Sequence, residues 1–322
     1  MPHQTTPFAK FTIALMLLGL GTAAVAQPTD ADWPRSQWHD DMRYERTQGV
    51  TRQGWNGSGT KKPHQFNIVS APYPVRYGTH SERFEIRPDD DNAMRDLGVT
   101  NGNRSELLQR PNVKNARIGE DAWFGWSFYH ENLFAASRSY GWYPMLGQWK
   151  TDLDAPPVIA FTPAFDGGPV REYIGIHLND LSRGKDEDWM AQNKYGFPCT
   201  RLFNIRISTG KWMDIVVNTN FSDGEDGYLN IWINSEKKCS YKGPIVSTPV
   251  DRFTSYGVRN QGPLFKRGYW SGSQSFPKRW LENHSDEPIP TFVVYYDEWR
   301  QGRSREEVDI RMIEAAGGPA VD

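Results

Sequence analysis

The sequence predicts an all-β protein, a single β-jelly-roll sandwich of two curved antiparallel sheets. Three observations predict this fold: short apolar or alternating runs follow one another, turn signals separate them, and no helical period lasts for three turns. The composition agrees, because 13 Trp, 14 Tyr and 16 Phe accompany 29 Gly and 22 Pro. With 322 residues, 38% of them hydrophobic and 24% charged, the chain fits one large sandwich and excludes a mainly disordered protein.

The N-terminus predicts a secretory signal peptide over residues 1–26. The apolar run Phe11–Gly21 follows Lys10 and leads to Ala24-Val-Ala26, the small-x-small pattern that signal peptidase cuts. The run is too short to cross a bilayer, which takes about 20 residues. We therefore expect a mature chain from Gln27 that is secreted or periplasmic and does not associate with membranes. A retained N-terminal anchor is the alternative.

The remaining chain divides into an N-terminal segment and one domain. Residues 27–63 are rich in Asp, Trp, Gly and Gln without a clear period, and we expect them to wrap the outside of a jelly-roll domain that spans residues 64–322. Helices are expected to be short and peripheral. Strands are predicted, in chain order, for Arg83–Arg87, Trp123–Tyr129, Met145–Trp149, Val158–Thr162, Glu172–Leu178, Leu202–Ile207, Trp212–Val217, Tyr228–Ile233, Thr291–Trp299 and Val308–Ile313.

The clearest hairpin surrounds the turn Asp223–Gly227. Apolar residues alternate on both sides of this turn, at Met213, Ile215, Val217, Leu229, Ile231 and Ile233. Because successive side chains point to opposite faces of a strand, Tyr228, Asn230 and Trp232 are expected on the other face.

Cys199 and Cys239 are the two cysteines of the chain. Export places thiols in an oxidising compartment, where they tend to pair, so we expect a disulfide between them. Two separate buried thiols are the alternative. No histidine lies near either cysteine at the spacing of a zinc site, so we expect no metal there.

Three short segments place polar side chains together on one face of a strand. The first and third residues of Arg104-Ser-Glu-Leu107 point the same way, as do the second and fourth of Gly147-Gln-Trp-Lys150. Phe265-Lys-Arg-Gly-Tyr-Trp270 repeats the pattern. Guanidinium and amide donors bordered by aromatic rings suit an anionic sugar chain. A solvated ladder of cross-strand ion pairs is the alternative.

The order and spacing of these segments resemble those of the heparin lyase I-like polysaccharide lyases, relatives of alginate lyases and glucuronan lyase with a concanavalin-like jelly roll. The resemblance spans about residues 83–299 and rests on Arg104-Ser-Glu-Leu107, Trp123-Phe-Gly-Trp-Ser-Phe-Tyr129, Leu146-Gly-Gln-Trp149, Gly210-Lys-Trp-Met213, Gly227-Tyr-Leu-Asn-Ile-Trp232 and Phe265-Lys-Arg-Gly268. It implies a concave substrate cleft on one sheet and β-elimination of a uronate-containing acidic polysaccharide without a required cofactor. A net charge of −2 argues against a nucleic-acid partner, and we expect a monomer.

The resemblance also implies roles for individual residues. Arg104 and Gln148 would neutralise the uronate carboxylate, Lys266 would lie in the cleft, and Glu106 would orient Arg104. Such donors are needed because the C5 proton is weakly acidic, and the enolate-like charge must be stabilised as it develops. Further substrate contacts are expected from Arg267, Trp270, Trp232 and His80.

Two departures from the family pattern concern proton transfer. Lys150 stands where close relatives carry a histidine, and Trp270 stands where they carry a tyrosine, with Tyr269 one residue early. A β-bulge at Gly268 would bring Tyr269 to the cleft face. Because the cations Lys266, Arg267 and Arg104 would favour its phenolate, we predict Tyr269 as the proton shuttle. Lys150 is a further catalytic candidate, and His177 is the reserve base.

Two other functions are open at this level. One is a non-catalytic carbohydrate-binding jelly roll for acidic glycans. The other is a glycoside hydrolase, which needs two carboxylates flanking the bond, and the laminarinase-type Glu-x-Asp-x-x-Glu motif is absent from the sequence. Calcium is an option at the acidic stretch Asp89–Asn92, which lacks a spaced ligand loop and is more typical of a solvated turn.

Overall fold

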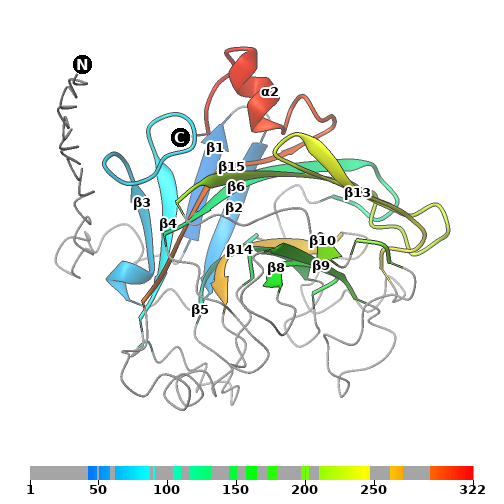
Figure 1. Ribbon diagram of the computed structural model, residues 1–322, viewed down its shortest axis with the longest axis horizontal. Coiled ribbons are helices and arrows are strands. Elements are labelled where there is room, and N and C mark those ends of the chain that lie inside the picture. The colour runs from blue at the N-terminus through cyan, green and yellow to red at the C-terminus, as the bar shows by residue number, and fades with distance from the viewer. Residues whose placement is uncertain are drawn as a thin grey trace, which may run out of the picture.

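Two antiparallel sheets packed face to face form the protein, as the sequence predicts (Figure 1). The computed structural model describes residues 43–48, 51–58, 62–87, 90, 104–109, 116–131, 145–150, 157–164, 173–179, 197–199, 201–202, 210–246, 262–270 and 291–321. In Figure 1 the seven-stranded sheet arches over the eight-stranded sheet, and the short helix α2 (Ile310–Ala315) lies on the far side of the arch.

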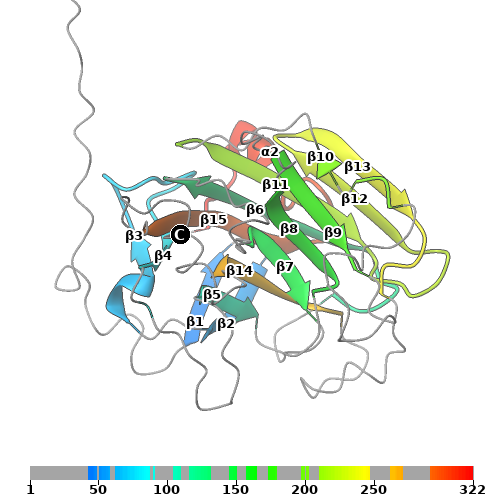
Figure 2. The ribbon, with the colours of Figure 1, turned by 60° about the horizontal axis from the view of Figure 1, so that its bottom comes forward.

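The eight-stranded sheet carries the three polar segments that the sequence singles out. Its strands are, in spatial order, β1 (Arg43–Gln48), β2 (Thr51–Ser58), β5 (Arg104–Gln109), β14 (Leu264–Trp270), β7 (Gly147–Lys150), β8 (Ile159–Ala164), β9 (Tyr173–Leu178) and β10 (Arg201–Leu202). Figure 2 shows β5, β14 and β7 side by side near the middle of this sheet.

The seven-stranded sheet closes the other side of the core. Its order is β13 (Glu236–Lys242), β12 (Tyr228–Ile233), β11 (Trp212–Thr219), β6 (Ala122–His130), β15 (Phe292–Gly302), β4 (Ser81–Ile86) and β3 (Phe66–Val69). A short 3-10 helix, η3 (Pro63–Gln65), precedes β3. In the described parts of the chain, no helix is long and apolar enough to cross a membrane.

Aromatic rings fill the space between the sheets. Trp126 of β6 meets Phe161 of β8 edge-on at 5.2 Å between ring centroids, and Trp149 of β7 lies 4.7 Å from Phe265 of β14. All four side chains are buried. Such ring pairs contribute about 0.5–1.5 kcal/mol each beyond the apolar area that they bury. These rings, which come from both sheets, therefore help to hold the two sheets together.

The predicted hairpin is present. Strands β11 and β12 pair antiparallel around the turn, with Val217 opposite Ile231. The six alternating apolar residues are buried in the core, and Trp232 on the opposite face is partly exposed. The alternation therefore reports correctly which face of each strand is inside.

Cys199 and Cys239 form the expected disulfide, with their Cα atoms 5.6 Å apart. Cys199 lies just before β10, an edge strand of the eight-stranded sheet, and Cys239 lies in β13, an edge strand of the other sheet. The bond therefore links the two sheets at one side of the sandwich.

One predicted strand is a helix. The run Val308–Ile313 contains α2, whose N-cap Asp309 accepts a hydrogen bond from the backbone N–H of Arg311. Ile310 and Ile313 are buried one helical turn apart, whereas Met312 is exposed. The alternation of apolar residues in this run is therefore coincidental, because burial follows the helical spacing.

The N-terminal segment contributes strands that the sequence does not reveal. β1 and β2 pair with each other, and β2 pairs with β5 so that Trp55 lies opposite Gln109. This part of the expected wrapping segment thus extends the eight-stranded sheet. The signal peptide predicted over residues 1–26 lies outside the described residues, as do residues 203–207 of the predicted strand that follows Cys199.

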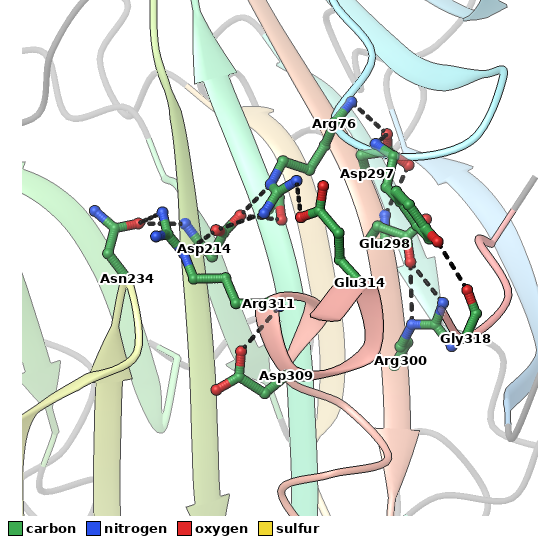
Figure 3. Close-up of polar contacts among 12 residues, drawn as sticks. Arg76, Asp214, Asn234, Asp297, Glu298, Arg300, Asp309, Arg311, Glu314 and Gly318 are labelled. Carbon is green, nitrogen blue, oxygen red and sulfur yellow. Dashed lines mark hydrogen bonds and ion pairs between the residues drawn. The ribbon is translucent and has the colours of Figure 1, made fainter. Parts of the chain in front are cut away.

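The C-terminal residues are anchored on the outer face of the seven-stranded sheet (Figure 3). A bulge in β15 between Asp297 and Arg300 places Glu298 in the left-handed region, with φ 54°. The buried Glu298 carboxylate accepts hydrogen bonds from Arg300 Nη2 at 2.6 Å and from the Val321 N–H at 2.8 Å. The bulge therefore provides the acceptor that holds the end of the chain.

Candidate functional site

Glu106 is the centre of a polar cluster on the face of the eight-stranded sheet that points away from the other sheet. Its carboxylate accepts a hydrogen bond from Gln148 Nε2 at 2.7 Å and from Lys266 Nζ at 2.7 Å. These residues come from β5, β7 and β14, and Lys266 lies directly opposite Gln148 in the register. The outer face means this face of the eight-stranded sheet, unless the seven-stranded sheet is named. The group that these residues form with Arg104 and Lys150 is the Glu106 cluster.

The strand alternation explains why these side chains meet. Within β5, Leu107 packs in the core, and the Ser105 hydroxyl donates to the Gln65 carbonyl oxygen. Their neighbours Arg104 and Glu106 therefore point outward, as the period of two requires. Burial gives the same result, because the Glu106 side chain is only 1% exposed, whereas Arg104 is partly exposed.

Cations surround the Glu106 carboxylate. Burial alone would raise the pKa of Glu106, but the charges of Lys266, Arg104 and Lys150 and the hydrogen bond from Lys266 hold it below its ordinary value. Burial and the nearby Arg104 lower the pKa of Lys266, while Glu106 opposes that change. The cluster thus holds more positive than negative side chains and favours the approach of another anion.

A row of residues continues from the cluster across the sheet. Lys266 lies opposite Gln148, Gln148 opposite Ala160, and Ala160 opposite His177. Partners in an antiparallel register point to the same face, so His177 shares the outer face with the cluster. Adjacent strands are about 4.8 Å apart, which puts His177 roughly 10 Å from Gln148. Between them, β8 presents only the methyl group of Ala160.

Thr162 fixes the His177 ring. Thr162 Oγ1 and His177 Nε2 are 3.0 Å apart, and both residues are buried. Neither Thr162 nor Ala160 is among the sequence-predicted site residues. The alternation of the predicted strand Val158–Thr162 does place these two residues on one face. The register that aligns this strand with its neighbours is not visible in the sequence.

The predicted proton shuttle does not lie on the outer face. Tyr269 is 2% exposed, and its ring stacks on Phe292 in the core at 5.4 Å. Burial raises its pKa well above the ordinary value, which is the reverse of the expected activation. The predicted bulge is also absent, because β14 pairs with β5 without a shift from Lys266 to Trp270.

Gly268 has another reason to be a glycine. Its φ is 119°, in the left-handed half of the map that other residues avoid, and a Cβ atom there would overlap the carbonyl oxygen of Ser105. The glycine therefore allows close approach of β5 to β14 within a regular register. Trp270 accordingly lies opposite Arg104 in that register.

Three predicted substrate contacts lie elsewhere. Arg267 points inward, where its guanidinium binds Glu82 through two hydrogen bonds of 2.5 Å. Trp232 is on the seven-stranded sheet, between Lys237 and Arg305, each 5.1 Å from its ring centroid. His80 precedes β4 in the same sheet and is exposed. The alternation of β14 and the division into two sheets account for these differences.

The stretch Asp89–Asn92, at which the sequence allows calcium binding, lies mostly outside the described residues. Of the stretch Asp89–Asn92, only Asp90 is described, and its carboxylate contacts His64 Nε2 at 2.9 Å and Lys62 Nζ at 2.9 Å. Among the described residues, no group of His, Cys, Asp and Glu could hold a metal ion.

Comparison with known proteins identifies the class. The model of the polysaccharide lyase family matches residues 47–300, so the chain belongs to this family and is a polysaccharide lyase. No curated protein matches the sequence. The match does not specify the heparin lyase I-like group, and that finer assignment stays a prediction.

A glucuronan lyase and an alginate lyase are among the solved structures to which this chain is similar. The endo-β-1,4-glucuronan lyase from the fungus Trichoderma reesei is 17% identical, with a TM-score of 0.48 over 80% of this chain and 98% of its own. The alginate lyase AlyC3 is 9% identical, with a TM-score of 0.45 over 81% of this chain and 89% of its own.

Proposed function

We propose that the chain cleaves a uronate-containing polysaccharide by β-elimination on the outer face of the eight-stranded sheet. The observation that carries this proposal is the row from Lys266 through Gln148 and Ala160 to His177. It has donors for a carboxylate at one end, an imidazole at the other and a small side chain between them. A sugar ring over Ala160 would bring its carboxylate to Gln148 and its C5 proton toward His177.

The cations of the Glu106 cluster supply the carboxylate site. Lys266 and Gln148 are held by Glu106, so their donors are oriented before substrate arrives. Arg104 and Lys150 are the partly exposed members. We infer that the substrate carboxylate approaches from their side and pairs with Arg104. Neutralising this carboxylate stabilises the enolate-like charge that develops when the C5–H bond breaks.

His177 is the better base of the two that remain once Tyr269 is placed in the core. A neutral imidazole accepts a proton directly, whereas Lys150, whose charge helps to lower the pKa of Glu106, must lose its own proton before it can act as a base. In the reaction, His177 takes the C5 proton, the electrons of the C5–H bond form the C4=C5 double bond, and the C4–O4 bond breaks. The leaving O4 takes a proton from water, and the His177 imidazolium returns its proton to the solvent. Lys150 then serves as a cation for the carboxylate.

Unsaturated uronates absorb in the low ultraviolet, which gives a direct test. We expect the protein to release such products from at least one of alginate, glucuronan, heparin, heparan or pectin. His177→Ala should lower the rate at least about 100-fold, the usual contribution of a general base, while binding is kept. His80→Ala is the matched control, because His80 is exposed on the other sheet, and it should keep full activity.

Each other outcome rejects part of the proposal. Full activity of His177→Ala, with loss of activity in Lys150→Ala, would make Lys150 the base. Binding of acidic polysaccharides without unsaturated product from any of them would reject β-elimination and favour the non-catalytic binding protein. The substrate panel also decides between sulfated and unsulfated polymers, because Arg, Lys and Gln bind carboxylate and sulfate alike.

We also propose that the protein acts outside the cytoplasm, in the periplasm or the medium. The disulfide between Cys199 and Cys239 supports this location, because such bonds persist in oxidising compartments. In this proposal the polysaccharide is the protein's only partner, and the chain acts as a monomer. A cleaved N-terminus at Gln27 in the exported protein would support this proposal, and retention of residues 1–26 in a cytoplasmic fraction would reject it.

A further inference from the structure

The outer face of the seven-stranded sheet carries a pocket that plays no part in the proposed elimination. Its volume is about 530 Å³, and it is lined by Arg76, Trp212, Arg311, Glu314 and Ala315. One wall is the helix α2, and the floor is the beginning of β11. The sandwich core separates this pocket from the Glu106 cluster on the other sheet.

A buried carboxylate fixes the charged walls of the pocket. Asp214, 3% exposed, accepts hydrogen bonds from Arg76 Nε at 2.9 Å, from Arg311 Nε at 2.6 Å and from Ser127 Oγ at 2.7 Å. Arg76 Nη1 also donates to Glu314 at 3.0 Å. Figure 3 shows the two arginines reaching Asp214 from opposite sides. The pocket is therefore built from side chains that hold one another in place.

An aromatic platform borders this charged group. Trp212 of β11 lies opposite Tyr129 of β6, and Tyr129 lies opposite Tyr295 of β15. The centroids of the Trp212 and Tyr129 rings are 5.5 Å apart, and both side chains are partly exposed. Tyr295 is buried and packs edge-on against Tyr129, with the Tyr73 ring 6.5 Å away. Trp212 thus presents an apolar ring at the pocket while its neighbours fix its position.

The charges of the pocket balance, which indicates the kind of ligand. Arg76 and Arg311 are positive, and Asp214 and Glu314 are negative, so a bare anion gains little there. Arg311 and Glu314 are 44% and 47% exposed, and both line the pocket, so they offer a donor and an acceptor to a ligand there. Sugar hydroxyls both donate and accept hydrogen bonds, and the C–H face of a pyranose packs on an aromatic ring.

We propose that this pocket is a second saccharide-binding site, in which one pyranose ring of a polysaccharide packs on Trp212 while its hydroxyls bind Arg311 and Glu314. The site faces away from the candidate active site, so it cannot extend the same row of subsites. It would instead keep the protein attached to a polymer, which raises the effective concentration of cleavable bonds. Only this last consequence rests on the proposed lyase reaction.

Native gel electrophoresis in gels that contain alginate or glucuronan tests the site without requiring cleavage. We expect Trp212→Ala to raise the polymer concentration for half-maximal retardation at least about fivefold, the factor that loss of about 1 kcal/mol of ring contact gives. Glu314→Ala should act in the same direction and leaves the aromatic packing intact. Trp232→Ala is the matched control on the same face, because that ring contacts Lys237 and Arg305 and does not line the pocket.

Wild-type mobility of both Trp212→Ala and Glu314→Ala in every polymer gel would overturn the proposal, as would an equal loss in Trp232→Ala. Activity separates this result from the reaction itself. If elimination occurs, Trp212→Ala should raise KM for the polymer and leave kcat unchanged, and a tetrasaccharide should be cleaved as by wild type. If no polymer is cleaved, retardation that depends on Trp212 still supports the second site.

Discussion

The ion pair between Glu106 and Lys266 should show strong coupling. Both side chains are nearly inaccessible, at 1% and 6% exposure, and their charged atoms are 2.7 Å apart. Removing one partner of such a pair leaves an uncompensated buried charge, which costs about 3–5 kcal/mol. We expect Glu106→Gln to lose about 3–4 kcal/mol of the free energy of unfolding, because the amide still accepts from Gln148 while three cations lose their counter-charge.

A double-mutant cycle measures this coupling. Lys266→Met should lose about 2–3 kcal/mol, less than Glu106→Gln, because Arg104 and Lys150 still face the carboxylate. The double variant should lose less than about 3 kcal/mol in total, since no buried charge of the pair remains. Urea unfolding followed by tryptophan fluorescence at pH 7 gives all four values. Losses that add within about 0.5 kcal/mol would show that the two groups do not interact and would refute the reasoning.

The same pair predicts a pH dependence. The pKa of Glu106 is lower in the folded protein than its ordinary value of 4.5, so its stabilisation is fully present above that pH. It is lost as the pH falls through the lower folded value. In urea unfolding, the free energy of unfolding of the wild type should therefore fall more than that of Glu106→Gln between pH 5 and strongly acidic solution. A parallel decline in the two proteins would contradict the assignment.

Two further predictions test the placement of residues in the two sheets. Tyr269→Phe should keep near-wild-type elimination, because its hydroxyl lies in the core; a loss of 100-fold or more with an unchanged fold would return Tyr269 to the mechanism. Asp214→Asn should lose about 2–3 kcal/mol in urea unfolding at pH 7, below the range for fully buried pairs because Arg311 is 44% exposed. Glu120→Gln, at a 63% exposed carboxylate, should change stability by less than about 0.5 kcal/mol and is the control.

The fold and the outward placement of the five residues of the Glu106 cluster were predictable from the sequence, because both depend on local alternation. A period of two determines that Glu106 points outward when Leu107 is buried, and neighbouring strands then bring Gln148 to it. Whether His177 aligns with Gln148 depends on the register of β7, β8 and β9, which turns and packing determine. No property of a single strand contains that information.

The wrong predictions have similar causes. Gly268 is compatible with either a bulge or a close approach of backbones, and only the position of β5 distinguishes them. In the run Val308–Ile313, the spacings of two and three residues overlap over so short a length that a strand and a helix have the same apolar pattern. β1 and β2 carry no alternation of their own, and their pairing with β5 places them in the sheet.

The alternation of side chains in β14 limits how the sequence of this enzyme can change. Lys266 belongs to the outer face, whereas Arg267 and Tyr269 belong to the core, so consecutive residues of one strand serve different purposes. Deleting or inserting one residue would exchange these two sets, burying the lysine without its carboxylate and expelling the arginine from Glu82. Substitutions in β14 can therefore be sampled one position at a time, but changes of length must occur outside it. In directed evolution, libraries that vary strand length should avoid Leu264–Trp270 and use the connections between strands.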